Sequence, residues 1–295
     1  MTLQSFKSIE DKLNVIGHEI FDVDEGSFGA RLPVYLHEFP QRNLGMINDR
    51  ANTLELDIGG RRYDVRQSPG LLTSSNAEGT TGAALWKVSP LLAEWLTDQT
   101  NTLWSTGILH SSAVLVELGC GITGLIGLAM AKQVSKYVLT DQRSVLKLLQ
   151  ENVDVNTPLP SRSKAKGRAS KVVSSSVDAN SKAQVAEINW EQDDADALDE
   201  VLGQGEVIDM VIVCDCVFND FLLQPLVTMC HKISARSSGR KTALLIAQQL
   251  RSDEVFSAFV DILVRSFRVW RLSDESLPPA LKNGSGFAVH LAILR

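Results

Sequence analysis

Residues 114–125 constrain the fold more than any other segment, because an apolar run is followed there by an acid, a glycine-rich turn and a second apolar run. Three glycines follow the pattern Gly-x-Gly-x-x-Gly: Gly119, Gly121 and Gly124. Glycine permits a tight turn and lets the backbone approach a ligand closely, while the next helix offers free N–H groups. The segment therefore predicts a buried strand, a ligand-binding turn and a helix.

Glu117, just before this turn, discriminates between the ligands that such a turn can bind. The glycine pattern also occurs in dinucleotide-binding folds and is weak by itself. A carboxylate here would crowd a pyrophosphate, whereas it suits a ligand that carries an ammonium group and a sulfonium. S-adenosylmethionine carries both, so we expect it as the cofactor, with Glu117 at its amino-acid end. The simpler alternative is a strand-end carboxylate that caps the following turn.

A second acid, Asp141, ends the next predicted strand, which covers residues 137–140. Asp141 follows Gly121 by 20 positions, the separation at which a carboxylate binds ribose hydroxyls in nucleotide-binding α/β folds. We therefore expect Asp141 to hold the ribose of the cofactor. As a simpler alternative, Asp141 is the N-cap of the helix that follows it.

The composition is that of an ordinary globular chain, with 295 residues, 44% apolar and 22% charged. This length suits one large α/β domain, alone or with an N-terminal extension. A net charge of −6 gives no general field for nucleic acid, and no apolar run approaches the ~20 residues of a membrane helix. The four cysteines form neither a disulfide nor a zinc pattern. We expect no metal, no membrane contact, and a cytoplasmic or also nuclear location.

From residue 81 onward, predicted strands and helices alternate, which indicates a parallel sheet covered by helices on both faces. The predicted strands are 113–118, 137–140, 185–188, 207–213, 242–247, 268–271 and 287–294, and the predicted helices are 86–96, 125–133, 143–152, 221–233 and 253–267. A turn-rich segment joins the last two strands, which indicates an antiparallel hairpin. We therefore predict an α/β, Rossmann-like, seven-stranded sheet of the class I methyltransferase type.

Two segments fall outside this alternation. Residues 1–80 form a β-rich N-terminal extension, with a strand-like run at 31–37 and a hairpin of strands 53–58 and 61–66, so the main domain is 81–295. Residues 157–182 are Ser-rich and basic. They indicate a surface insertion, or else an arm that contacts ribosomal RNA through residues 162–171. No aromatic residue lies among these charges, which argues against base stacking.

Four further residues are candidates for the site. Trp190 follows the third strand, where it can stack on adenine, and Trp86 can wall the cofactor from the other side; each could instead be a core tryptophan. Asp215 follows a fully apolar strand into the ligand crevice and could orient a lysine ammonium, while Phe218 flanks the alkyl stem. A carboxylate raises the pKa of a nearby lysine, so we assign Asp215 to docking and not to deprotonation. Its alternative role is an N-cap.

Together these residues resemble the seven-β-strand lysine methyltransferases of methyltransferase family 16, over about residues 80–294. The matching motifs are Thr81-Gly82 with Trp86, Glu117-Leu-Gly-Cys-Gly121, Asp141, Trp190 and Asp215-Cys-Val-Phe218. The resemblance implies cofactor contacts from Trp86, Gly119, Cys120, Gly121, Asp141, Trp190 and Cys214. The family often has tyrosine where this chain has Phe218, so a phenol hydroxyl is missing.

Within this family, the extension and residues 219–226 resemble the fungal ribosomal lysine N-methyltransferase 5 group. That likeness implies monomethylation of a lysine in the stalk protein of the large (60S) ribosomal subunit. Two other classes remain open. A methyltransferase for a nucleic-acid base or metabolite is disfavoured, because the prolines of Asn-Pro-Pro-Tyr are absent at 215–218. The second is a silent cofactor-binding module or a nucleotide-dependent oxidoreductase, of which Glu117 and the closing hairpin disfavour the oxidoreductase.

Overall fold

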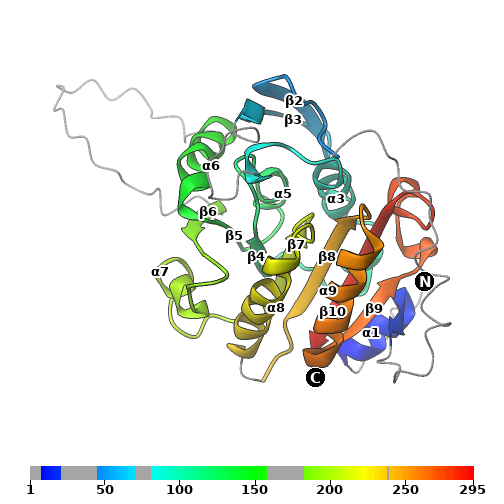
Figure 1. Cartoon of the computed structure of the whole chain (residues 1–295). Coiled ribbons are helices and arrows are strands. Elements are labelled where there is room, and N and C mark those ends of the chain that lie inside the picture. Colours follow the sequence, from blue (N-terminus) through cyan, green and yellow to red (C-terminus); the bar gives the residue numbers. More distant parts are fainter. Residues whose placement is uncertain (1–7, 21–44, 71–80, 158–182, 238) are drawn as a thin grey trace.

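The computed structural model describes residues 8–20, 45–70, 81–157, 183–237 and 239–295, and an eight-stranded sheet is its centre (Figure 1). The strand order is β1-β9-β10-β8-β7-β4-β5-β6. The parallel strands are β4 Val114–Leu118, β5 Lys136–Asp141, β6 Ala183–Glu187, β7 Met210–Cys214 and β8 Ala243–Gln249. Strand β10 Phe287–Leu294 lies antiparallel between β8 and β9 Phe267–Leu272. The predicted Rossmann-like sheet with its antiparallel hairpin is confirmed.

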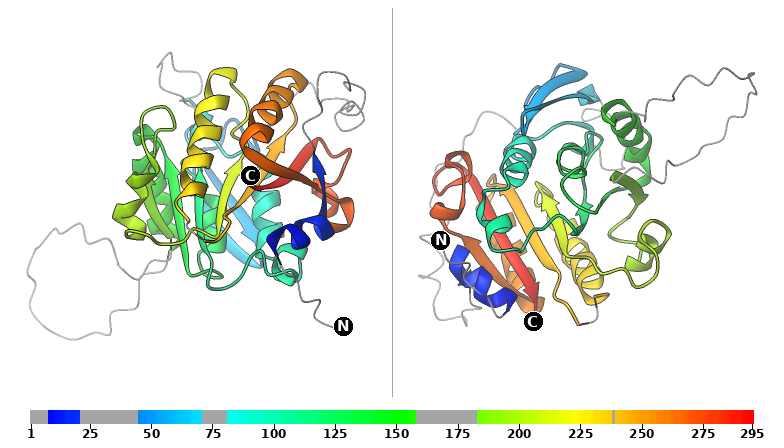
Figure 2. Two further views of the ribbon diagram at one scale, coloured as in Figure 1. Left: turned by 90° about the horizontal axis from the view of Figure 1, so that it is seen from below. Right: turned by 180° about the vertical axis from the view of Figure 1, so that it is seen from behind.

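Helices cover both faces of the sheet (Figure 2). One face carries α3 Val88–Thr97, α5 Leu125–Met130 and α6 Arg143–Asn156, and the other carries α8 Asp220–Ala235 and α9 Asp253–Ser266. Strands β4, β7 and β8 are buried along their whole length, because side chains on both sides of such a sheet face a core. The short helices are α4 Thr102–Ser105 and α7 Asp199–Leu202. Among the described helices, none has the length and apolar character needed to cross a membrane.

An eighth strand, which the sequence did not predict, comes from the N-terminal segment. Helix α1 Ile9–Ile16 leads into β1 Gly17–Ile20, which pairs antiparallel with β9. Arg268 of β9 binds Glu19 of β1, with 2.7 Å between Nε and Oε1. Leu13 and Ile16 join the core that also contains α3 and α5. The division at residue 80 stays a prediction, and the expected strand 31–37 lies outside the described residues.

The predicted hairpin is confirmed as β2 Thr53–Ile58 and β3 Arg61–Arg66, which form a separate two-stranded sheet. Two asparagine amides attach β3 to helix α6. Asn152 accepts from the N–H of Arg66 at 2.7 Å and donates to its C=O at 2.9 Å, and Asn156 does the same with Asp64 at 3.0 and 2.9 Å. The two asparagines are one helical turn apart on α6, and the two residues that they bind are two positions apart on β3. Their amides therefore provide hydrogen-bond partners for backbone N–H and C=O groups at the edge of this strand. The basic insertion, from residue 158 onward, is outside the described ranges.

Candidate active site

The glycine turn joins β4 to α5 at the carboxyl end of the parallel strands. Gly119 and Gly121 have φ values of 70° and 66°, in the left-handed region that favours glycine. A Cβ at Gly119 would lie 2.8 Å from Cζ2 of Trp190, and a Cβ at Gly121 would lie 3.0 Å from the carbonyl oxygen of Gly82. Neither position therefore has room for a side chain, because Trp190 and the backbone of Gly82 lie directly against the turn.

Asp141 lies directly beside this turn. Its Oδ2 accepts a hydrogen bond from the N–H of Gly121 at 2.8 Å, and its Oδ1 accepts one from the N–H of Gln142 at 2.8 Å. The N-cap position of α6 belongs to Gln142, so the simple N-cap alternative for Asp141 is wrong. Burial raises the pKa of Asp141 from 3.8 to about 6, against the lowering effect of the two backbone N–H groups. A carboxylate has about four acceptor positions, so oxygen lone pairs remain for the hydroxyls of a ribose.

Glu117 is buried beneath the same turn, with 2% of its surface exposed. Its Oε2 accepts a 2.7 Å hydrogen bond from the hydroxyl of Tyr137, a partner that the sequence analysis missed. Burial raises the pKa of Glu117 from 4.5 to about 7, although the Tyr137 hydroxyl lowers it, and the charge of Asp141 adds to the rise. Glu117 therefore sits near its own titration point at neutral pH. A cationic group that binds next to Glu117 would favour its ionised form.

The two candidate tryptophans are half-buried, and neither belongs to the fully buried core. Trp190 lies against the glycine turn, as its proximity to the Gly119 position shows. Trp86 donates from Nε1 to the carbonyl oxygen of Thr81 at 3.0 Å, on the segment just before α3. Both rings thus keep surface that a planar ligand can cover.

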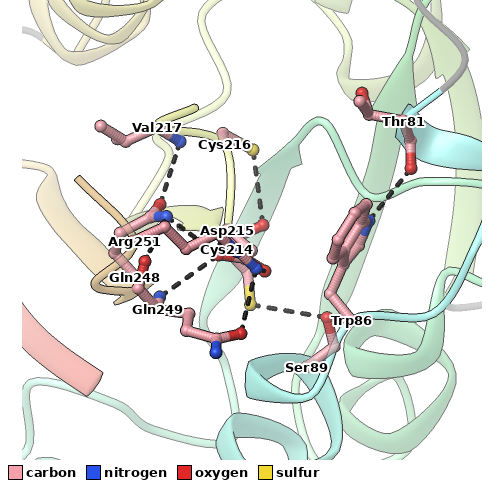
Figure 3. Close-up of polar contacts among 10 residues, drawn as sticks. All are labelled: Thr81, Trp86, Ser89, Cys214, Asp215, Cys216, Val217, Gln248, Gln249 and Arg251. Atoms are coloured by element: carbon pink, nitrogen blue, oxygen red, sulfur yellow. Dashed lines mark hydrogen bonds and ion pairs between the residues drawn. The ribbon is translucent and has the colours of Figure 1, made fainter. Parts of the chain in front are cut away.

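Asp215 follows β7 and is the only non-glycine residue with a positive φ, 60°, within the described ranges. Aspartate tolerates this left-handed conformation better than most residues. The N-cap of α8 is Asn219, which accepts from the N–H of Phe221, so the N-cap alternative for Asp215 is wrong. Instead, Figure 3 shows polar groups from the end of β8 gathered around its carboxylate.

This carboxylate is bound by an arginine that the sequence analysis missed. Arg251 donates from Nη1 to Oδ1 at 2.8 Å and from Nη2 to Oδ2 at 2.6 Å. Gln248 Nε2 and the N–H of Gln249 also donate to Oδ1, at 2.9 and 3.2 Å. The guanidinium carbon of Arg251 lies 5.1 Å from the ring centre of Trp86. Polar residues follow the apolar strand β8 in the same way as Asp215 follows β7, but this pattern does not by itself join Arg251 to Asp215.

Cys120, Cys214 and Cys216 surround the turn as buried free thiols, and burial raises the pKa of each well above its usual value. Cys214 Sγ lies 3.7 Å from Ser89 Oγ. Phe218 is 40% exposed and lies three residues beyond Asp215, where it is accessible from solvent. No group of three or more metal-ligating side chains occurs in the part of the chain that the structure describes.

The arrangement fits S-adenosylmethionine. Neither Glu117 nor Asp141 has an ion pair among the described residues, although Glu117 is buried and Asp141 is half-buried close to the glycine turn. A ligand that brings an ammonium group and a ribose diol would satisfy these two carboxylates. Trp190 lies beside Gly119 of the turn, and Trp86 lies beside Thr81 and Arg251, so both contribute half-buried aromatic surface to this region. The structure thus brings together the predicted cofactor residues, and it places Asp215 and Phe218 on the adjacent loop after β7.

Comparison with known proteins matches this chain to one protein family and to several curated proteins. The family model described as lysine methyltransferase matches residues 66–264. The ribosomal lysine N-methyltransferase 5 of Zygosaccharomyces rouxii is 28% identical over 229 residues, which cover 70% of this chain and 72% of that protein. A diaminohydroxyphosphoribosylamino-pyrimidine deaminase of Schizosaccharomyces pombe is 28% identical over 235 residues, or 80% of this chain, and the match spans only 50% of that relative's length.

Among solved structures, the 16S rRNA N2 G1207 methyltransferase of T. thermophilus superposes with a TM-score of 0.46 and 16% identity, covering 82% of this chain and 50% of that one.

Proposed function

This chain belongs to the lysine methyltransferase family, and we propose that it transfers one methyl group from S-adenosylmethionine to a lysine of a large-subunit (60S) ribosomal protein, the protein of the stalk. The match to the family model covers the glycine turn, Asp141, Trp190 and the loop after β7. The ribosomal substrate is supported by relatives named ribosomal lysine N-methyltransferase 5, of which the Eremothecium gossypii protein is 25% identical over 90% of its length.

The bound cofactor supplies a methyl group on a sulfonium, an electrophile that a neutral amine can attack. In this chain, Asp141 is placed to bind the ribose hydroxyls and Glu117 to attract the ammonium group. Trp190 and Trp86 would enclose the bound cofactor and exclude water, and the Cys214 thiol would pack beside it. Phe218 is placed to align the alkyl stem of the lysine. Such alignment is the main contribution a protein can make to this reaction.

One observation carries the proposal. Glu117 of β4 is buried just before the glycine turn, and Asp141 of β5 accepts a hydrogen bond from the N–H of Gly121 in that turn. The loop after β7 contacts the start of the same turn, with Cys216 Sγ 3.3 Å from the carbonyl oxygen of Leu118. A cofactor bound by Glu117 and Asp141 would thus lie beside the loop after β7, which carries the residues that we assign to the acceptor lysine. Strands β4 and β7 are hydrogen-bonded neighbours, so this juxtaposition is built into the sheet.

The test is a labelling experiment. Lysate and purified large ribosomal subunits from cells that lack this protein are incubated with labelled S-adenosylmethionine and the recombinant chain, and labelled bands are identified by mass spectrometry. We expect one labelled lysine in a large-subunit protein. Gly121→Val serves as the control, because a β-branched residue at φ 66° closes the turn and should abolish labelling.

Two outcomes would contradict the proposal. Label in RNA or in a small metabolite would place the chain in another class of methyltransferase. Binding of S-adenosylhomocysteine without any labelled product would indicate a silent cofactor-binding module. We further propose the cytoplasm, or also the nucleus, as its location, a proposal that its four buried free cysteines support.

A further inference from the structure

The acceptor side of the site contains an ion pair whose charge bears on the acceptor lysine. The side chain of Asp215 is 1% exposed and that of Arg251 is 26% exposed. Two parallel hydrogen bonds join them, which is the strongest geometry available to a carboxylate and a guanidinium. In the protein without substrate, the charge of Asp215 is therefore already balanced.

This balance matters because only a neutral amine has the lone pair that attacks a methyl group. A lysine ammonium has a reference pKa of ~10.4, and an unpaired carboxylate within about 4–6 Å raises it by ~1–3 units. An Asp215 without a partner would therefore hold the lysine in its unreactive form. A paired Asp215 adds no net negative charge to the loop, and only its Oδ2, which accepts a single hydrogen bond from the described residues, keeps an acceptor position for an N–H group.

We propose that Arg251 is a positioning residue for methyl transfer, which neutralises Asp215 so that the acceptor loop can orient a lysine without holding its proton. The inference rests on the proposed lysine methylation. Arg251 acts through Asp215 and need not touch the substrate.

Neighbouring groups hold Arg251 in this place. Gln249 Oε1 accepts a further hydrogen bond from Nη2 at 3.1 Å, and the guanidinium lies against the face of Trp86. Gln248 binds Asp215 through Nε2 and accepts from the N–H of Val217 through Oε1 at 2.9 Å, which fixes the loop. Lysine could not replace this planar, bidentate and stacked arrangement.

Other titratable groups near the pair come from the neighbouring elements. Glu117 of β4 and Asp141 of β5 have pKa values raised by burial to about 7 and about 6. The thiol of Cys214, at the end of β7, has a pKa raised by burial and by the charge of Asp215. Because substitutions at 215 and 251 leave all three residues in place, a comparison between variants isolates the ion pair.

The experiment measures single-turnover methylation of the labelled acceptor protein from pH 6 to 9.5, beside calorimetry with S-adenosylhomocysteine. In Arg251→Met the midpoint of the pH–rate profile should rise by about one unit or more, because Asp215 is left unpaired. In Asp215→Asn the midpoint should fall, because the Asp215 carboxylate then no longer offsets the positive charge of Arg251. The double variant should return toward the wild-type midpoint.

Arg268→Met is the matched control. Arg268 also binds a glutamate, Glu19, and lies 4.8 Å from the ring centre of a tryptophan, Trp270, but on β9 at the far side of β8 and β10. Its profile should keep the wild-type midpoint. Equal loss of rate at every pH in Arg251→Met, or the same midpoint in Asp215→Asn as in the wild type, would overturn the inference.

Folding failure cannot imitate the expected result, since the two single variants move the midpoint in opposite directions. If Arg251→Met does not fold, the midpoint of the pH–rate profile of Asp215→Asn still tests the inference. Failure of the proposed function looks different, because the wild type would then bind S-adenosylhomocysteine and methylate no lysine at any pH.

Discussion

Replacing Glu117 with glutamine should make the protein more stable at neutral pH. Glu117 is 2% exposed and accepts a hydrogen bond from Tyr137, and burial raises its pKa from 4.5 to about 7. Between these two values the folded protein holds a proton that the unfolded chain has lost. The free energy of unfolding therefore falls as pH rises through this window, because the folded state binds more protons.

The size of this change in the free energy of unfolding follows from the shift in the pKa of Glu117. A difference of about 2.5 units, at about 1.4 kcal/mol per unit, corresponds to ~3 kcal/mol at pH 8. Glutamine keeps the shape of the side chain and can still accept from Tyr137, but it has no charge to bury. Glu117→Gln should thus match the wild type at pH 4.5 and exceed its stability by up to ~3 kcal/mol at pH 8.

Urea unfolding of the ligand-free protein at pH 5, 6, 7 and 8 measures this difference. Asp141 contributes a similar slope between 3.8 and about 6, and its charge also raises the pKa of Glu117, so the comparison between the two proteins is made at pH 7 and 8, above that window. As a control, Glu19→Gln should show the opposite sign, since the hydrogen bond from Arg268 lowers the pKa of Glu19 and its loss should destabilise the protein at neutral pH. A stability difference between Glu117→Gln and wild type that does not change with pH would refute the reasoning.

The same variant tests the proposed contact with the cofactor. If Glu117 binds the ammonium group, its ionised form binds more tightly, and affinity for S-adenosylhomocysteine should rise from pH 6 to pH 8. In Glu117→Gln this rise should be absent. Calorimetry at both pH values measures it, and identical pH dependence in the two proteins would remove Glu117 from the cofactor contacts.

Three other substitutions have definite expected results. Gly119→Val should abolish binding of S-adenosylhomocysteine in calorimetry, because a side chain at φ 70° would collide with Trp190; retained binding would place the ligand elsewhere. Asp141→Ala should weaken that binding by ~1–3 kcal/mol, whereas an unchanged affinity would leave Asp141 as a support for the turn. Asn152→Leu should lower the free energy of unfolding in urea by ~2–3 kcal/mol, because the backbone groups of Arg66 lose their buried partner. Unchanged stability would contradict this role.

The strands and helices from β4 onward could be predicted because short apolar runs, typical of buried strands, alternate along the sequence with longer segments that have a helical pattern of apolar residues. Strand β1 gave no such signal. It has only four residues, Gly17–Ile20, and it exists because β9 offers an unpaired edge and Arg268 binds Glu19. Helix α6 runs to Asn156, past the predicted end at 152, in a region where its amides bind β3. Contacts between distant segments set these features, and a local pattern does not contain them.

Most candidate site residues could be predicted for a different reason. The carboxyl ends of parallel strands meet at one edge of the sheet, so a polar residue just after an apolar strand is placed near the ligand. The partners of these residues follow only from strand register. Glu117 lies opposite Leu139 in the pairing of β4 with β5, and Tyr137 is two residues earlier on the same face. A sequence without the register gives no reason to join Glu117 to Tyr137.

Asp215 shows where reasoning from burial alone is incomplete. An acid that follows an apolar strand needs a partner, since an isolated buried charge is strongly unfavourable. The sequence analysis assigned that need to the substrate. In the structure Arg251 meets it, from a segment just beyond β8 where no periodic pattern places a side chain. The need for a partner was predictable, but its source was not. Because the partner is internal, the loop after β7 is polar without a net negative charge from Asp215, which under the proposed function would favour the neutral form of a lysine amine.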